Sequence, residues 1–118
     1  MDKQRRKELK AQALETKIMM GVYQIKNRRN GKVYLATSSN LKNQWMRQKM
    51  QLDEGKHMNR KLQQDWTSGS EDEFEFSVLE EHEVEPEMNV KWELSQLEKA
   101  WLEKLQPFDE NGYNHHPR

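Results

Sequence analysis

Two tyrosines stand where their hydroxyl groups could act on a phosphate. Tyr23 and Tyr34 lie in two β-rich runs, residues 21–26 and 32–36, joined by a turn that ends in Asn30-Gly31. Asn and Gly accept the positive φ that a tight turn needs, so the stretch predicts a β-hairpin that brings the two phenols near one another. Each hydroxyl can bind a phosphate oxygen or a water molecule. The alternative is that both are ordinary strand tyrosines whose rings only pack.

The composition indicates one small domain. The chain has 118 residues, of which 33% are apolar and 34% charged, so long polar side chains must cover a small core. It contains no cysteine, which excludes disulfides and thiolate metal sites. No apolar run reaches the length of a membrane span, and the basic start is not followed by the apolar stretch of a signal peptide. We expect a cytoplasmic protein that does not enter membranes.

Charge is distributed unevenly along the chain. Residues 1–65 carry 16 Lys or Arg against 6 Asp or Glu, and residues 66–118 carry 4 against 14, although the net charge is zero. One interpretation is a basic surface for a polyanion and an acidic surface elsewhere. The other is that the two halves fold against each other and largely cancel. Residues 2–19 have a helical pattern with a strongly basic start, which either contacts phosphate or forms a solvated helix.

The remaining pattern predicts an α/β (α+β) fold. Capping residues and apolar residues at helical spacing indicate the helices, two of which are ended by Gly55 and Pro107. One strictly alternating run indicates a strand. After the hairpin we expect helices over residues 41–52, 58–66 and 90–105, a strand over residues 73–78, and a turn-like end over residues 111–118. The strand should join the hairpin, because two strands alone are marginal in water. The prediction is a three-stranded antiparallel sheet flanked by helices, preceded by an N-terminal helix.

Several segments together resemble the GIY-YIG nuclease family, especially its phage and intron homing-endonuclease branch. Gly21-Val22-Tyr23 and Tyr34-Leu35-Ala36 stand in the places of the two triplets that name the family. The likeness continues through residues 30–34, 55–66, 74–81 and 97–103 and through Tyr113-Asn114. It implies a GIY-YIG-like domain over residues 20–114, with a basic helical extension over 1–19 and a flexible tail over 115–118.

The resemblance implies metal-assisted cleavage of DNA. Glu98 takes the place of the family's metal-binding glutamate and would hold Mg²⁺ or Mn²⁺, which stabilises charge on the phosphate and on the leaving oxygen. A single carboxylate suits Mg²⁺, which keeps most of its water ligands. By the same resemblance, Tyr23 and Tyr34 would orient or deprotonate the attacking water, and Asn114 would support the site by hydrogen bonding.

The sequence also departs from the family. Ala36 replaces the glycine that ends the second triplet, and a methyl group there could crowd a substrate strand. Gln44 falls where the family carries an arginine that binds the scissile phosphate, and Gln48 falls where it often carries histidine or tyrosine. Glutamine donates hydrogen bonds but supplies no full positive charge. Arg47, one helical turn from Gln44, is our candidate to compensate.

Other basic side chains in the first half are candidate phosphate contacts. We predict that nucleic acid is bound by the following residues: Lys42, Lys49, Lys56, His57, Arg60 and Lys61. All four histidines are interpreted as surface residues. Trp45 and Trp66 either stack on bases or, at helical spacing among Leu and Met, belong to the core.

Three functions are compatible with these features. The first is a GIY-YIG-type endonuclease that hydrolyses DNA with a divalent metal, weakened by the loss of charge at Gln44 and Gln48. The second is a degenerate member that binds nucleic acid without cutting it. The third is a protein-interaction module, in which the acidic half contacts a basic partner or a second copy of the chain, giving a homo-oligomer through the oppositely charged halves.

Overall fold

A computed structural model describes residues 17–116 of the chain. Residues 1–16 and 117–118 lie outside the described part, and with them nearly all of the helix predicted over residues 2–19. The last residues of the predicted helix are described, and they are not helical: residues 17 and 18 are irregular and the first strand begins at Met19. Among residues 17–116, no helix combines the length and the apolar character that crossing a bilayer requires.

A three-stranded antiparallel sheet forms the centre of the molecule, as predicted. Its strands are β1 (Met19–Asn27), β2 (Val33–Ser38) and β3 (Phe74–Glu83), in the order β2-β1-β3. The β1–β2 turn closes at Gly31, whose φ of 76° explains the Asn-Gly signal. β3 runs further than the predicted strand, because it pairs with the whole of β1 from Asn27 back to Met19.

The described helices are α2 (Gln44–Asp53), α3 (Arg60–Ser68) and α4 (Val90–Leu105). α4 has the predicted bounds, and the side chain of Asn89 caps it by accepting from the Trp92 N–H. α2 begins three residues later than predicted. The N–H of Leu41 donates to the carbonyl oxygen of Met19, and Asn43 takes a left-handed conformation, so the chain reaches helical geometry only at Gln44.

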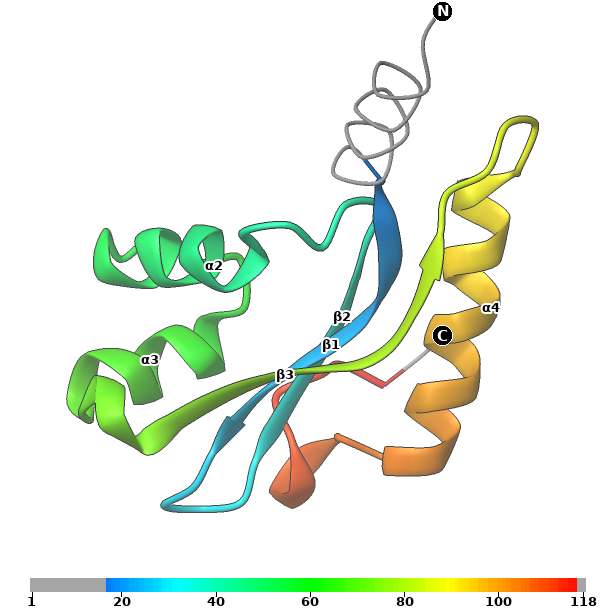
Figure 1. Ribbon diagram of the computed structural model, residues 1–118. Coiled ribbons are helices and arrows are strands. Elements are labelled where there is room, and N and C mark those ends of the chain that lie inside the picture. The colour runs from blue at the N-terminus through cyan, green and yellow to red at the C-terminus, as the bar shows by residue number, and fades with distance from the viewer. Residues whose placement is uncertain (1–16, 117–118) are drawn as a thin grey trace, which may run out of the picture.

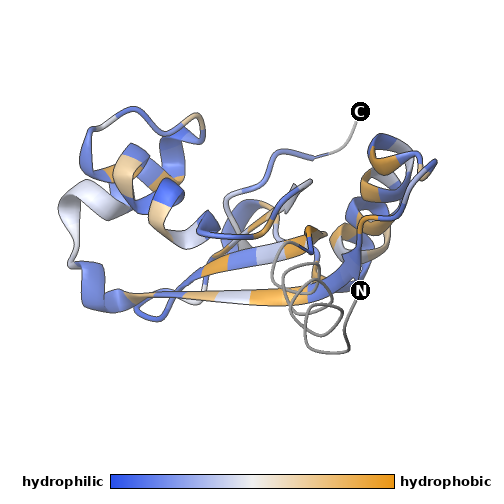
Figure 2. Cartoon of the chain, turned by 45° about the horizontal axis from the view of Figure 1, so that its top comes forward, coloured by the Kyte–Doolittle hydropathy of each residue, from blue (hydrophilic) through white to orange (hydrophobic). Residues whose placement is uncertain are grey.

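The sheet runs between two groups of helices. Figure 1 shows α2 and α3 at one side of the twisted sheet and α4 at the other. Apolar and polar residues are interleaved along the strands and along α4 (Figure 2). The core that joins α2 and α3 to the sheet consists of Ile25, Leu52, Leu62, Trp66, Phe74 and Tyr113.

The two tryptophans of the first helices belong to this core. The Trp45 ring stacks on Phe76 with centroids 5.5 Å apart and meets the edge of Trp66 at 6.1 Å. Of the two interpretations of these rings, the structure therefore supports packing, and neither ring is free to stack on a base.

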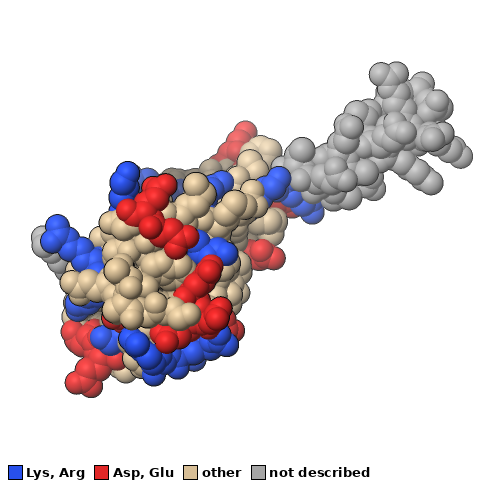
Figure 3. Space-filling view, turned by 90° about the vertical axis from the view of Figure 1, so that its left-hand side faces the viewer, with Lys and Arg blue, Asp and Glu red and all other residues tan. Residues whose placement is uncertain are grey.

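The oppositely charged halves of the chain touch one another. Three ion pairs join a basic residue of the first half to a glutamate of the second: Lys17–Glu83, Arg29–Glu73 and Lys49–Glu71, at 3.5–3.7 Å. Figure 3, which looks onto the side of α2 and α3, shows both signs of charge interspersed. The charges therefore cancel in part on the surface, and the first half does not form an unbroken basic face there.

Gly21, which opens the first triplet, is required by a close approach of two strands. The β1–β3 register shifts between Val22 and Tyr23, and a Cβ on Gly21 would overlap the carbonyl oxygen of Glu80. A side chain here would push β3 away from β1 directly beside Tyr23. The glycine therefore helps to place the first tyrosine.

Tyr113 fastens the C-terminal segment to the rest of the fold. Its ring is 1% exposed, and its hydroxyl donates to Asp65 Oδ2 at 2.6 Å and accepts from Asn27 Nδ2 at 3.1 Å. Burial, and then the hydrogen bond to Asp65, raise the pKa of Tyr113 to about 12. Of the end predicted as turn-like, the described residues 111–116 are thus anchored to the fold by the buried Tyr113.

Replacing Tyr113 by Phe should destabilise the protein by about 1–3 kcal/mol, because Asp65 and Asn27 lose a buried partner. Urea unfolding followed by circular dichroism measures this. Trp92→Phe, at an aromatic residue 56% exposed, should change stability by less than about 0.5 kcal/mol. Equal stability of Tyr113→Phe and wild type would show that the hydroxyl does not fasten the segment.

Candidate active site

A cleft of about 670 Å³ opens between α2 and α4, over the β1–β2 hairpin. Its walls come from both strands, both helices, the turn before α3 and the C-terminal segment. The lining residues that bear on function are Tyr23, Tyr34, Ala36, Gln44, Gln48, His57, Glu98, Asn114 and His115. Four of the five predicted catalytic residues, all but Arg47, therefore meet in one cavity.

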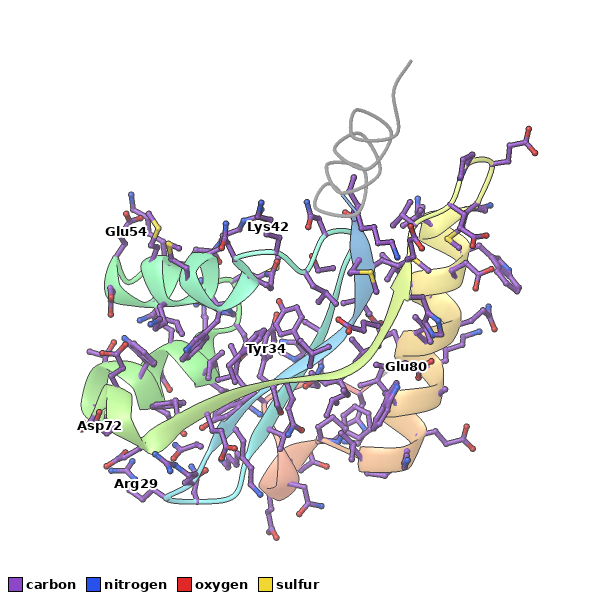
Figure 4. The ribbon with its side chains drawn as sticks, in the orientation of Figure 1. Arg29, Tyr34, Lys42, Glu54, Asp72 and Glu80 are labelled. Carbon is purple, nitrogen blue, oxygen red and sulfur yellow. The ribbon has the colours of Figure 1, made fainter. Side chains whose placement is uncertain are left out.

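The two phenols share this cleft because of the strand register. Tyr23 pairs with Ala36, and Ile25 pairs with Tyr34, so the tyrosines are diagonal neighbours on one face of the sheet. Figure 4 shows Tyr34 at the centre of the molecule, between α2 and the sheet. Glu98 comes from α4, beside the stripe of Leu94 and Leu97.

Both phenols are neutral at ordinary pH. Burial, and then the neighbouring Tyr34, raise the pKa of Tyr23 far above its usual value of 10, against a smaller opposing effect of its hydrogen bond with Gln44. Burial, and then the negative charge of Glu98, raise the pKa of Tyr34. A general base works best with a pKa near the operating pH. The protein alone therefore favours phenols that orient water over phenols that deprotonate it.

Glu98 fits a single-carboxylate metal site. Its side chain is solvent-accessible in the cleft, and within residues 17–116 its carboxylate forms neither a hydrogen bond nor an ion pair. No group of three or more His, Asp or Glu able to hold a metal occurs in the described part of the chain. An ion held here would therefore keep most of its water ligands, which is the behaviour of Mg²⁺.

Gln44 takes part in a chain of neutral hydrogen bonds. Its side chain is 8% exposed, its Nε2 donates to the Tyr23 hydroxyl at 3.2 Å, and its Oε1 accepts from Ser38 Oγ at 3.1 Å. The amide thus positions Tyr23 from β1 against α2. It brings no positive charge to the cleft.

His57 was predicted to be a surface residue, and that prediction is wrong, although the residue lines the cleft. The side chain is 7% exposed, because the turn before α3 folds it against α2 and the edge of the Tyr34 ring. His57 Nδ1 accepts from the backbone N–H of Asn59 at 3.0 Å, so its proton lies on Nε2, which donates to Gln48 Oε1 at 2.6 Å. Burial lowers the pKa of His57, which favours this neutral form.

The tautomer of His57 in turn orients Gln48. Because Gln48 Oε1 accepts from His57, the NH₂ group of the Gln48 amide is left for the cleft, which Gln48 lines. One feature of the sequence indicates this arrangement. Asn59, two residues after His57, is the N-cap of α3 and fixes the turn that carries His57. The other histidines are exposed, although His115 lines the cleft and His116 stacks on Phe108 at 4.6 Å.

Asn114 supports the cleft from the outer edge of β2. Its Oδ1 accepts from the Leu35 N–H and its Nδ2 donates to the Leu35 carbonyl oxygen, both at 2.8 Å. The side chain thus binds β2 as a neighbouring strand would, at the middle residue of the second triplet, all of which lines the cleft. Both polar atoms of the Asn114 side chain are therefore used in holding β2.

Arg47 does not reach the cleft. Gln44, Gln48 and Gln51 share the face of α2 that lines it, and Arg47 is exposed outside that face. Among the described residues, neither Lys nor Arg lines the cleft, so Arg47 does not replace the missing charge in this arrangement.

The lysines and the arginine that were predicted to contact phosphate do not line the cleft. Lys42, Lys56, Arg60 and Lys61 are exposed, and Lys42 stands at the start of α2 (Figure 4). Lys49 is 3.5 Å from Glu71 and lies over the Trp45 ring, so its charge is already partnered.

Comparison with known proteins matches this geometry to a catalytic domain. Residues 19–114 match the family profile described as the GIY-YIG catalytic domain. The chain belongs to the GIY-YIG family. The fold and the family resemblance expected from the sequence are therefore confirmed, and the homing-endonuclease branch is supported by the relatives.

The proteins to which this GIY-YIG chain is similar include intron and homing endonucleases. It is 34% identical over 94 residues to intron-associated endonuclease 1 of enterobacteria phage T4, covering 80% of this chain and 36% of that protein. Two solved structures of the catalytic domain of homing endonuclease I-TevI are similar, one of them a point mutant. Their TM-scores are 0.66 and 0.68, at 32% and 33% identity, with 83% and 82% of this chain and 99% and 93% of theirs covered.

The His57 assignment can be checked directly by NMR. Nitrogen shifts should show the Nε2–H tautomer, and the ring should titrate below the usual value near 6.5, because burial disfavours its charged form. Since the unfolded chain then binds the extra proton first, His57 stabilises the fold above about pH 6.5 and loses that contribution as pH falls toward its folded pKa. An Nδ1–H tautomer, or a midpoint above 6.5, would contradict the assignment.

Proposed function

We propose that this GIY-YIG domain hydrolyses phosphodiester bonds of DNA with a divalent metal, at a reduced rate. One observation carries the proposal: the Glu98 carboxylate, which has no partner among residues 17–116, shares a cleft with the phenols of Tyr23 and Tyr34. The phage endonucleases to which the chain is similar support a nucleic-acid substrate. The match covers 36% of the length of the phage T4 relative. The proposal therefore concerns cleavage alone and not the recognition of a particular DNA target.

Each residue has a distinct part in the proposed reaction. Glu98 would hold the ion, which when bound supplies positive charge to the phosphate and to the leaving oxygen. The neutral hydroxyls of Tyr23 and Tyr34 donate to water or to a phosphate oxygen and so fix the line of attack. Gln44 fixes Tyr23, and Asn114 fixes the strand that carries Tyr34.

The reduced rate follows from the charge of the cleft. Gln44 and Gln48 present amide groups, and no described Lys or Arg lines the cavity. Neutral donors stabilise the growing charge of a transition state less than a guanidinium does. Loss of such a donor typically lowers the rate by about a hundredfold or more.

The same observation supports a second candidate, DNA binding without cleavage. The exposed Lys42, Lys56, Arg60 and Lys61 could hold phosphates while the neutral cleft fails to activate one. The two candidates differ in whether the Glu98 carboxylate and the metal matter to the outcome.

Replacing Glu98 by Gln should lower cleavage of plasmid DNA in Mg²⁺ or Mn²⁺ by about a hundredfold or more, because the carboxylate for the ion is lost. Nicking is followed on agarose gels, with metal removed by chelator as a second arm. Glu93→Gln on the same helix, outside the cleft, is the matched control and should cut as wild type. If wild type and Glu98→Gln cut alike in metal, the nuclease proposal is lost; if neither cuts but both bind DNA, the binding candidate stands.

Restoring charge at Gln44 should accelerate the reaction. Gln44→Arg should raise the cleavage rate by about tenfold to a hundredfold, because the guanidinium supplies the charge that the amide lacks. Single-turnover rates on one plasmid measure this, with Gln44→Met as the control that removes the amide without adding charge. A Gln44→Arg enzyme no faster than Gln44→Met would contradict a charge deficit as the cause of slow cleavage.

A further inference from the structure

Two smaller hollows adjoin the cleft along α4, and Glu98 lines all three cavities. One, of about 260 Å³, is formed by Thr37, Lys91, Leu94, Ser95 and Glu98. The other, of about 370 Å³, lies toward the C-terminal end of α4 and is lined by Ser95, Glu98, Lys99, Leu102, Glu103, Gln106 and Phe108. A groove therefore extends along the helix on both sides of Glu98.

Helical periodicity explains this groove. Lys91, Ser95, Glu98 and Leu102 follow one another at intervals of four, three and four residues, so they form a single stripe on α4. This stripe lies next to the apolar one that includes Leu94, which packs toward the sheet. The groove thus runs parallel to the helix axis.

We propose that the hollow of Thr37, Lys91 and Ser95 binds a phosphate of the same DNA strand whose scissile phosphate lies at Glu98. This inference rests on the proposed function. The hollow offers one ammonium group and two hydroxyls, all of which donate hydrogen bonds to phosphate oxygens. Lys91 is exposed and forms no ion pair within residues 17–116, so its charge is available.

The other hollow is a poorer phosphate site. It also contains a lysine, Lys99, but Glu103 adds a second carboxylate beside that of Glu98. Two negative charges next to one positive charge disfavour an anion. In the hollow of Lys91, Glu98 is the one acidic residue, so the two charges of that lining balance even before an ion is bound.

The spacing indicates which phosphate would be bound. Lys91 precedes Glu98 by seven helical positions, which is about 10 Å along the helix axis at 1.5 Å per residue. Successive phosphates of one strand of duplex DNA are separated by more than their axial rise of about 3.4 Å, because the strand winds around the duplex axis. A strand that follows the groove would therefore place a phosphate about one to three positions from the scissile one in this hollow.

The test is the salt dependence of DNA binding without metal, measured by fluorescence anisotropy with a labelled duplex of fixed sequence. Lys91→Ala should reduce the slope of log K against log salt by about 0.9, because one phosphate contact is lost. Lys91→Arg, which keeps the charge, should retain the wild-type slope. Lys104→Ala is the matched control: the same charge is lost from the same helix, but Lys104 lies over the Trp101 ring outside all three cavities.

The measured salt slopes distinguish failure of the phosphate site from failure of the proposed nuclease function. If wild type binds with a steep salt slope and Lys91→Ala keeps that slope, the phosphate site is overturned while the nuclease proposal stands. If Lys104→Ala lowers the slope as much as Lys91→Ala does, the effect is general charge and the site is again overturned. If wild type shows no salt-dependent binding, the proposed function itself fails and this inference fails with it.

Discussion

The register between β1 and β2 is the constraint on which the cleft depends. Pairing Tyr23 with Ala36 and Ile25 with Tyr34 puts both phenols on one face. A slip of one residue would turn one phenol to the opposite face and expose part of the core with it. Several contacts oppose that slip: the turn at Gly31, the Asn114 side chain along the edge of β2, and the close approach of β3 at Gly21.

In the cleft, the carboxylate of Glu98 lies among uncharged hydrogen-bond donors. Burial keeps Tyr23 and Tyr34 protonated, and burial also lowers the pKa of His57 and so favours its uncharged form. Glu98 is thus the one acidic residue of the described lining, and neither Lys nor Arg accompanies it. The negative charge of such a site attracts a cation and repels DNA. Binding of the anionic DNA therefore depends on the positive charge of the ion and of the Lys and Arg residues outside the cleft.

Local patterns predicted the elements, and tertiary contacts decided the rest. The Asn-Gly turn, the alternation around Phe76 and the stripe on α4 were enough to predict the sheet and its helices, whereas the meeting of Glu98 with the tyrosines was implied by the family resemblance. The burial of His57 could not be predicted, because it depends on how the turn before α3 closes onto α2. The exclusion of Arg47 depends on where α2 begins, and that is set by a backbone bond between Leu41 and Met19.

The most direct test of the account is where a metal ion binds. Mn²⁺ added to the isotope-labelled protein broadens NMR signals of nearby nuclei, and the pattern can be compared with that of Glu98→Gln. The account predicts broadening first at Glu98 and at the rings of Tyr34 and Tyr23, with the effect absent in the variant. Broadening centred on the glutamates of β3, unchanged in Glu98→Gln, would contradict a metal site in the cleft.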